Sequence, residues 1–217
     1  MITLALKQAA VAWTVMLLGA GPYTLEEFQR MCAEEPGSLP RYFPAGVIEN
    51  QNPDAEQWWN CKNSRFLARM QERQLWPAPR DLEAYRFLWD RFGHLIVIRL
   101  EKRGDHLLLV RKEADVHYGF EPGPLLVNET RSISREQWLR FKELLKKAKS
   151  PEAGVASYLD SSIPKEEWTL EGIESGEYHV DVWYQSSALP PHRDALSSYL
   201  FWMAGIPTAS GRSEKSE

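Results

Sequence analysis

The chain has 217 residues, a length that fits one large domain or one domain with a small appendage. Hydrophobic residues make up 43% of the sequence and charged residues 26%, and this balance excludes a disordered protein. The net charge of −4 argues against a nucleic-acid-binding domain, and the mean hydropathy of −0.44 argues against a multi-span membrane protein. We therefore expect no nucleic-acid partner and no stable membrane span.

An uncharged run from Ala9 to Gly21 lies near the N-terminus, shortly after the basic residue Lys7. It is shorter than the stretch of about 18 apolar residues that a transmembrane helix needs. Its length and the small residues at its end are typical of a secretory signal, so we predict a signal peptide over residues 1–21. The alternative is a retained, buried N-terminal helix. A cleaved signal implies a periplasmic or secreted protein.

The chain contains two cysteines, Cys32 and Cys61. In an exported protein they can close a disulfide loop, which stabilises the fold by roughly 3–4 kcal/mol in the chain-entropy model. Two buried free thiols are the alternative. Neither cysteine has a second cysteine or a histidine at ligand spacing, so we expect no metal at this position. We predict a Cys32–Cys61 disulfide that ties two helices together.

Residues 22–79 are predicted to form a helical N-terminal segment. A capping-box pattern predicts a first helix over 25–33. Pro53 after a capping Asn52 predicts a second helix that runs to Arg73. The segment is therefore expected to be a helical hairpin.

Residues 80–207 are predicted to form an α+β domain, followed by a disordered tail over 208–217. Runs of β-branched and apolar residues predict strands at 95–98, 106–112, 125–132, 168–173 and 178–185. Helical periodicity predicts helices at 135–148 and 194–204. Hairpins without βαβ crossovers indicate a mainly antiparallel sheet of about five strands with helices on one face.

The helix at 135–148 has the clearest local signals. Ser134 and Gln137 have the spacing of a capping box. Trp138, Phe141 and Leu145 recur at helical spacing and predict an apolar face that packs on the sheet. We expect this face to contact Ile96, Ile98, Leu170 and Val180 or their neighbours.

His179 and Asp181 are the best candidates for a ligand site, because alternate residues of a strand share one face. A two-residue turn at 175–176 would fix the register of their hairpin. Glu171, the nearest further carboxylate, then points to the other face, so a catalytic constellation does not close. A hydrogen-bonded structural histidine is the alternative interpretation. In this register His179 lies opposite Gly172, Asp181 lies opposite Leu170, and Trp168 lies opposite Trp183.

Two further groups of residues are candidates for a binding or metal site. Trp58 and Trp59 are adjacent, so on a helix they diverge, and one of them is available for a partner or glycan surface. Glu113, Asp115 and His117 alternate along a strand, a spacing at which they could hold a metal, but a solvated strand edge is the favoured interpretation. The sequence lacks the GxSxG, HExxH, P-loop and GxGxxG motifs.

Several short motifs resemble a broad group of uncharacterised bacterial proteins, predicted to be envelope or lipoprotein-like. The motifs lie within 84–183 and include Trp-x-Leu-Glu-Gly from Trp168 and Gly-x-Tyr-His-Val from Gly176. This chain is one residue shorter than the group between His179 and Trp183. The resemblance implies a bacterial origin and carries no known activity.

These observations leave two classes of function. We expect a non-enzymatic extracytoplasmic binding or inhibitory protein of the bacterial envelope, such as an immunity-like protein, whose partner is another protein and which needs no cofactor. The alternative is a small metal-dependent hydrolase that uses His179 and Asp181, or Glu113, Asp115 and His117.

Overall fold

The structure is a computed structural model. The residues that it describes are 30, 32, 41–46, 53–79, 81–91, 93–116, 122–149, 166–185 and 190–207. The predicted signal peptide at 1–21 and the predicted tail at 208–217 lie outside these residues, as does most of the predicted first helix of the hairpin. In the described part of the chain, no helix has the length and apolarity needed to cross a bilayer.

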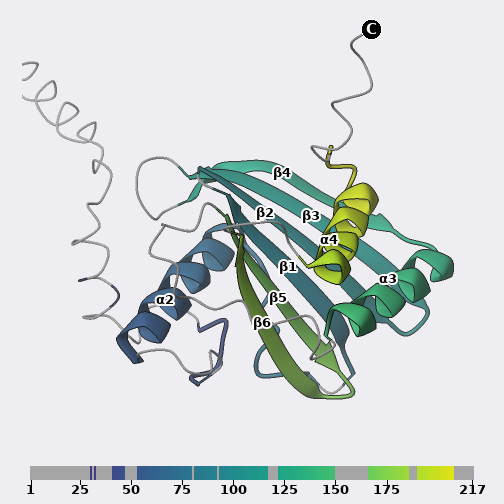
Figure 1. Cartoon of the computed structure of the whole chain (residues 1–217), viewed down its shortest axis with the longest axis horizontal. Helices are drawn as coiled ribbons and strands as arrows, with labels where there is room; N and C mark the ends of the chain where they lie inside the picture. Colours follow the sequence, from purple (N-terminus) through teal and green to yellow (C-terminus); the bar gives the residue numbers. More distant parts are fainter. Residues whose placement is uncertain are drawn as a thin grey trace, which may run out of the picture.

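The described residues form one antiparallel sheet and three helices (Figure 1). The helices are α2 (Pro53–Arg69), α3 (Arg135–Ala148) and α4 (Pro191–Ala204). The strands are β1 (Glu83–Arg91), β2 (His94–Arg103), β3 (His106–Val116), β4 (Pro122–Ser132), β5 (Glu166–Glu174) and β6 (Glu177–Gln185). They are ordered β4-β3-β2-β1-β5-β6, so β4 and β6 are the two outer strands.

The α+β class is confirmed, with six strands where about five were predicted. The additional strand is β1, which lies in the middle of the sheet between β2 and β5. Four of its nine residues are charged, so a prediction based on runs of apolar residues did not identify it as a strand. Its Arg86 is nevertheless fully buried, because Glu171 of β5 lies opposite and accepts hydrogen bonds from its guanidinium.

Helices cover both faces of the sheet, whereas the sequence predicted helices on one face. The cause is that β1 and β2 carry apolar side chains on both faces of the sheet, and each face needs cover from water. On one face, α3 and α4 pack on a core that includes Phe87, Ile96 and Ile98. On the other face, Trp59, Phe66 and Leu67 of α2 pack with Leu88, Leu95 and Val97. The predicted helical hairpin is not seen in the described residues, in which α2 alone forms a long N-terminal helix.

Helix α3 forms as predicted. The Ser134 hydroxyl accepts from the amide N–H of Gln137, whose side chain in turn accepts from the amide of Ser134, and this completes the capping box. Trp138, Phe141 and Leu145 are buried in one core with Ile96, Ile98 and Leu170. Val180 was expected in this core but packs on the opposite face, because neighbouring residues of β6 alternate between faces. There it contacts the core that α2 forms with Leu88, Leu95 and Val97, which we call the α2 cluster.

The β5–β6 hairpin has the predicted register. Ser175 and Gly176 form its turn with φ of 55° and 80°, the positive values that a type I′ turn requires. His179 therefore pairs with Gly172, and Asp181 with Leu170, while Glu171 faces the α2 side. The disulfide between Cys32 and Cys61 is confirmed, with a Cα–Cα distance of 5.7 Å, and it links α2 to the chain that precedes it.

Candidate functional site

Four ionisable side chains from three elements meet at the outer strand β6, and we call them the β6 cluster: Lys149, His179, Asp181 and Arg193. His179 and Asp181 alternate along β6 and point to the face that α3 and α4 cover. Lys149 is the C-cap residue of α3. Arg193 lies in the first turn of α4. Residues far apart in the sequence are thus brought together at the rim of the sheet.

The cluster divides into two pairs. The Lys149 ammonium donates to Nε2 of His179. Arg193 Nη2 lies 3.5 Å from Oδ2 of Asp181, and its guanidinium carbon lies 5.0 Å from the ring centre of Trp183. Each of the two β6 side chains is therefore engaged by its own cation.

Burial and charge fix the protonation states of the cluster. Burial lowers the pKa of His179 to about 4, and the neighbouring Lys149 charge adds to this effect. The imidazole is therefore neutral near pH 7, and its Nε2 lone pair can accept a hydrogen bond from the Lys149 ammonium. Burial also lowers the pKa of Lys149. Burial raises the pKa of Asp181, although Arg193 and Lys149 oppose that rise.

Gly172 makes room for the His179 ring. The imidazole lies across β5, where a methyl group on Gly172 would overlap it and would approach Cδ1 of Tyr85 to 2.8 Å. Tyr85 and His179 have ring centres 6.2 Å apart. The φ of Gly172 is not positive, so backbone conformation does not require a glycine here. The glycine is needed because the side chains of His179 and Tyr85 approach so closely.

Buried hydrogen-bond donors without a partner among the described residues lie on the α3 and α4 face of the sheet. Arg193 is only 7% exposed, yet its Nε has no hydrogen-bond partner among the described residues. Within the same part of the chain, the indole Nε1 atoms of Trp183 and Trp168 are also buried without a partner. Buried donors are nearly always satisfied in folded proteins, so an acceptor from outside the described residues would be favoured here.

The other predicted site residues have different environments. Trp59 is 2% exposed, and its indole Nε1 donates to Glu167 at 2.9 Å. Trp58 is half-buried at the edge of the α2 cluster, with the Lys62 ammonium 5.3 Å from its ring centre. As expected for adjacent helical residues, one indole enters the core and the other does not.

Glu113 and Asp115 lie near each other on β3, and a residue that the sequence analysis did not select joins them. His94 of β2 contacts both carboxylates, with Nδ1 at 3.2 Å from Asp115 and Nε2 at 3.2 Å from Glu113. Strand register is the signal that could have found it, because His94 lies directly opposite Asp115. His117 lies outside the described residues. No set of three His, Cys, Asp or Glu side chains in the described ranges is arranged to hold a metal ion.

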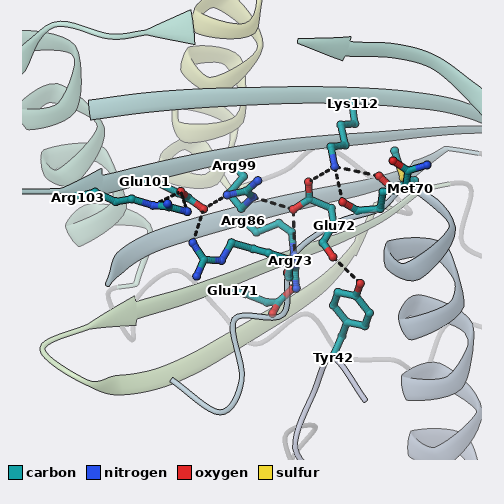
Figure 2. Close-up of polar contacts among 11 residues, drawn as sticks. Tyr42, Met70, Glu72, Arg73, Arg86, Arg99, Glu101, Arg103, Lys112 and Glu171 are labelled. Atoms are coloured by element: carbon teal, nitrogen blue, oxygen red, sulfur yellow. Dashed lines mark hydrogen bonds and ion pairs between the residues drawn. The ribbon is translucent and has the colours of Figure 1, made fainter. Parts of the chain in front are cut away.

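A second group of charges is buried between the sheet and the end of α2, and we call it the Glu72 network (Figure 2). The Glu72 carboxylate accepts from Arg99 Nε at 2.8 Å and lies 3.0 Å from the Lys112 ammonium and 3.6 Å from Arg86. Arg86 also donates to Glu171 at 2.8 Å. The other charged members are Arg73, Glu101 and Arg103, and both arginines pair with the Glu101 carboxylate at the rim.

The Glu72 network fastens the segment after α2 to the sheet. Lys112 donates to the main-chain oxygens of Met70 and Gln71 at 3.0 and 2.7 Å, and Arg86 donates to that of Arg73 at 2.6 Å. These bonds satisfy main-chain carbonyl groups of the segment that follows the helix. Arg86 and Arg99 lie opposite each other on β1 and β2, and Glu72 between them offsets their repulsion. The described contacts account for this network as a structural element.

The β6 cluster is therefore the best candidate site, because it combines perturbed pKa values, unpaired donors and partial exposure. Perturbed ionisable groups that converge from separate elements are typical of functional sites. No protein-family model and no curated protein matches the chain. The function must accordingly be inferred from the chemistry of this cluster.

Proposed function

We propose that the chain is a non-enzymatic binding protein of an extracytoplasmic compartment, and that it holds a protein partner at the β6 cluster. The observation that carries the proposal is Arg193, a buried residue that is 7% exposed and whose Nε has no hydrogen-bond partner among the described residues. Arginine presents five donors in a planar fork that suits carboxylate and carbonyl oxygens. A partner's acidic side chain or main-chain carbonyl is an acceptor of the kind that this guanidinium binds.

The arrangement of the cluster favours binding over acid–base catalysis. A general base must be able to take up a proton near the working pH. His179 has its pKa lowered to about 4 and its Nε2 occupied by Lys149, so it is poorly suited to that role. Asp181 is held by Arg193, and Glu171 lies on the opposite face of the sheet.

The position of the cluster suits a large partner. In the described part of the chain β6 is an outer strand that pairs only with β5, so the cluster lies at the rim of the sheet. The Asp181 side chain is 38% exposed, whereas that of Arg193 is 8% exposed. A partner that approaches β6 from the side would meet the exposed Asp181 and Lys149 first and the guanidinium behind them.

The disulfide supports the proposed compartment. Disulfides persist in oxidising compartments and are rare in the cytosol, where thiol reductants keep cysteines reduced. The Cys32–Cys61 bond joins α2 to the chain before it, so it restrains an element that forms one layer of the fold. We expect thiol-trapping of protein from the native host to find both cysteines oxidised; free thiols would contradict the extracytoplasmic assignment.

Site-specific photo-crosslinking in the native host tests the binding site. A photoreactive phenylalanine at position 149 should give an adduct of one discrete mass, because Lys149 lies at the cluster. The same replacement of Lys147, an exposed α3 residue that pairs with Glu143, is the matched control. Asp181→Asn and Lys149→Glu should each reduce capture of that partner. Equal adducts at positions 147 and 149, or capture unchanged by both variants, would refute the proposed site.

A further inference from the structure

Strand β4 forms the outer edge of the sheet opposite β6, and it pairs only with β3 in the described part of the chain (Figure 1). All five residues of its segment Asn128-Glu129-Thr130-Arg131-Ser132 are exposed, so neither face of this segment is covered. Natural edge strands are usually protected from pairing by proline, bulges or inward-pointing charges. Here the prolines and the bulge are confined to the other half of β4, around residues 122–126.

The segment is complementary to itself in the antiparallel direction. When a second copy is turned about an axis through Thr130, Glu129 lies opposite the second copy's Arg131, and the reverse pair forms on the other side. Asn128 then lies opposite Ser132, and Thr130 lies opposite itself. Opposite charges and Thr–Thr or amide–hydroxyl pairs are the combinations that stabilise directly opposed positions of a sheet. We propose that β4 pairs with the β4 of a second copy of this chain, which makes one continuous sheet across a dimer.

The faces of the strand agree with this arrangement. Glu129 and Arg131 lie opposite Arg111 and Leu109 of β3, on the face that α3 and α4 cover. Thr130 lies opposite Val110, so it and its alternate neighbours Asn128 and Ser132 are on the α2 face. The ion pairs would thus form on one face of the joined sheet and the hydroxyl and amide pairs on the other.

Other symmetric registers are disfavoured. A twofold axis normal to the sheet keeps each face on its own side, so opposed residues must come from the same face and the axis must pass through a residue. An axis through Glu129 would oppose two carboxylates, and an axis through Arg131 would oppose two guanidinium groups. The Glu129 carboxylate is available for a new partner, since it is 66% exposed and its ion pair with Arg111 spans 4.0 Å.

Sedimentation equilibrium of the full chain tests the proposal. A contact through one strand pair is small, so we expect weak dimers whose average mass rises toward twice that of one chain between about 1 μM and about 1 mM. Added salt should weaken the dimer, because the charge pairs are exposed. A monomer throughout this range would overturn the proposal.

Charge reversal identifies the contact. Glu129→Lys and Arg131→Glu should each raise the dissociation constant at least about tenfold, because two repulsive pairs replace two attractive ones. The double variant E129K/R131E restores the opposition of charges and should recover the dimer. Glu177→Lys, an exposed residue on the other outer strand with the same change in charge, should have no effect. A dimer that survives both single reversals would use another surface and would refute the assignment.

A cysteine pair gives a readout that does not depend on charge. Thr130→Cys should form a covalent dimer under mild oxidation, since only the residue on the axis lies opposite itself. Ser132→Cys, two residues along the same face, is the control and should remain monomeric. Equal cross-linking of the two variants, or failure of Thr130→Cys to cross-link, would contradict the Thr130-centred register. A complex with a different protein at β4 in the native host would be a second contrary result.

Discussion

Replacing Glu72 with glutamine should strongly destabilise the fold. The side chain of Glu72 is fully buried, and its carboxylate lies between Arg99 at 2.8 Å, Lys112 at 3.0 Å and Arg86 at 3.6 Å. Glu72→Gln keeps the shape of the side chain but removes the charge that these three cations share. Glu171 and Glu101 then remain as the carboxylates nearest to them.

The expected magnitude follows from the loss of one partner of a buried ion pair. Such a change typically costs about 3–5 kcal/mol, because it leaves an uncompensated buried charge. That is a large part of the total stability of roughly 5–15 kcal/mol that is usual for a domain. For a chain of this size, each kcal/mol lowers the melting temperature by about 2–4 °C, so we expect a decrease of about 6–20 °C.

Urea denaturation followed by circular dichroism measures the effect. Glu143→Gln is the matched control, because Glu143 is exposed and pairs with Arg140 and Lys147 on the surface of α3. We expect the control to leave the unfolding midpoint nearly unchanged, as is usual for exposed ion pairs. A Glu72→Gln midpoint equal to that of the wild type would show that the network does not bear on stability.

The pH dependence provides a second readout. Burial alone would raise the pKa of Glu72, but the charges of Arg99, Arg86 and Lys112 outweigh it and hold the pKa below its ordinary value of 4.5. A carboxylate with a lowered pKa in the folded state contributes stability above its ordinary pKa and loses that contribution as the pH falls. The wild type should therefore lose stability below about pH 4.5 more steeply than Glu72→Gln. Parallel curves would contradict this account.

Three further predictions concern the face that α3 and α4 cover. The His179 imidazole should titrate near pH 4 by NMR. Lys149→Gln should move this midpoint upward, because it removes a neighbouring positive charge, and an unchanged midpoint would mean that Lys149 is not at the ring. Gly172→Ala should destabilise by about 1–3 kcal/mol and shift the His179 resonances, because the added methyl overlaps the ring, and a neutral effect would refute the close approach. Trp138→Ala should cost roughly 3–5 kcal/mol in thermal or urea unfolding, since Trp138 is 5% exposed in the core, and a loss below about 1 kcal/mol would exclude an anchoring role.

Features that depend on a few neighbouring residues were predictable from the sequence. The capping box of α3 needs Ser134 and Gln137 at a fixed spacing, and the β5–β6 register needs two turn residues that accept positive φ. The same register placed His179 and Asp181 on one face and Glu171 on the other. The Cys32–Cys61 pairing followed from a count of two cysteines in a chain with an apparent export signal.

Tertiary structure alone decided which charges are buried and what each of them contacts. The sequence of β1 resembles a polar segment, because its Arg86 can enter the core only when Glu171 and Glu72 from other elements surround it. The partners of His179 and Asp181 likewise come from the end of α3 and the start of α4. Hydrophobic periodicity and turn chemistry act over a few residues, whereas the cost of burying a charge depends on groups that only the folded chain brings together.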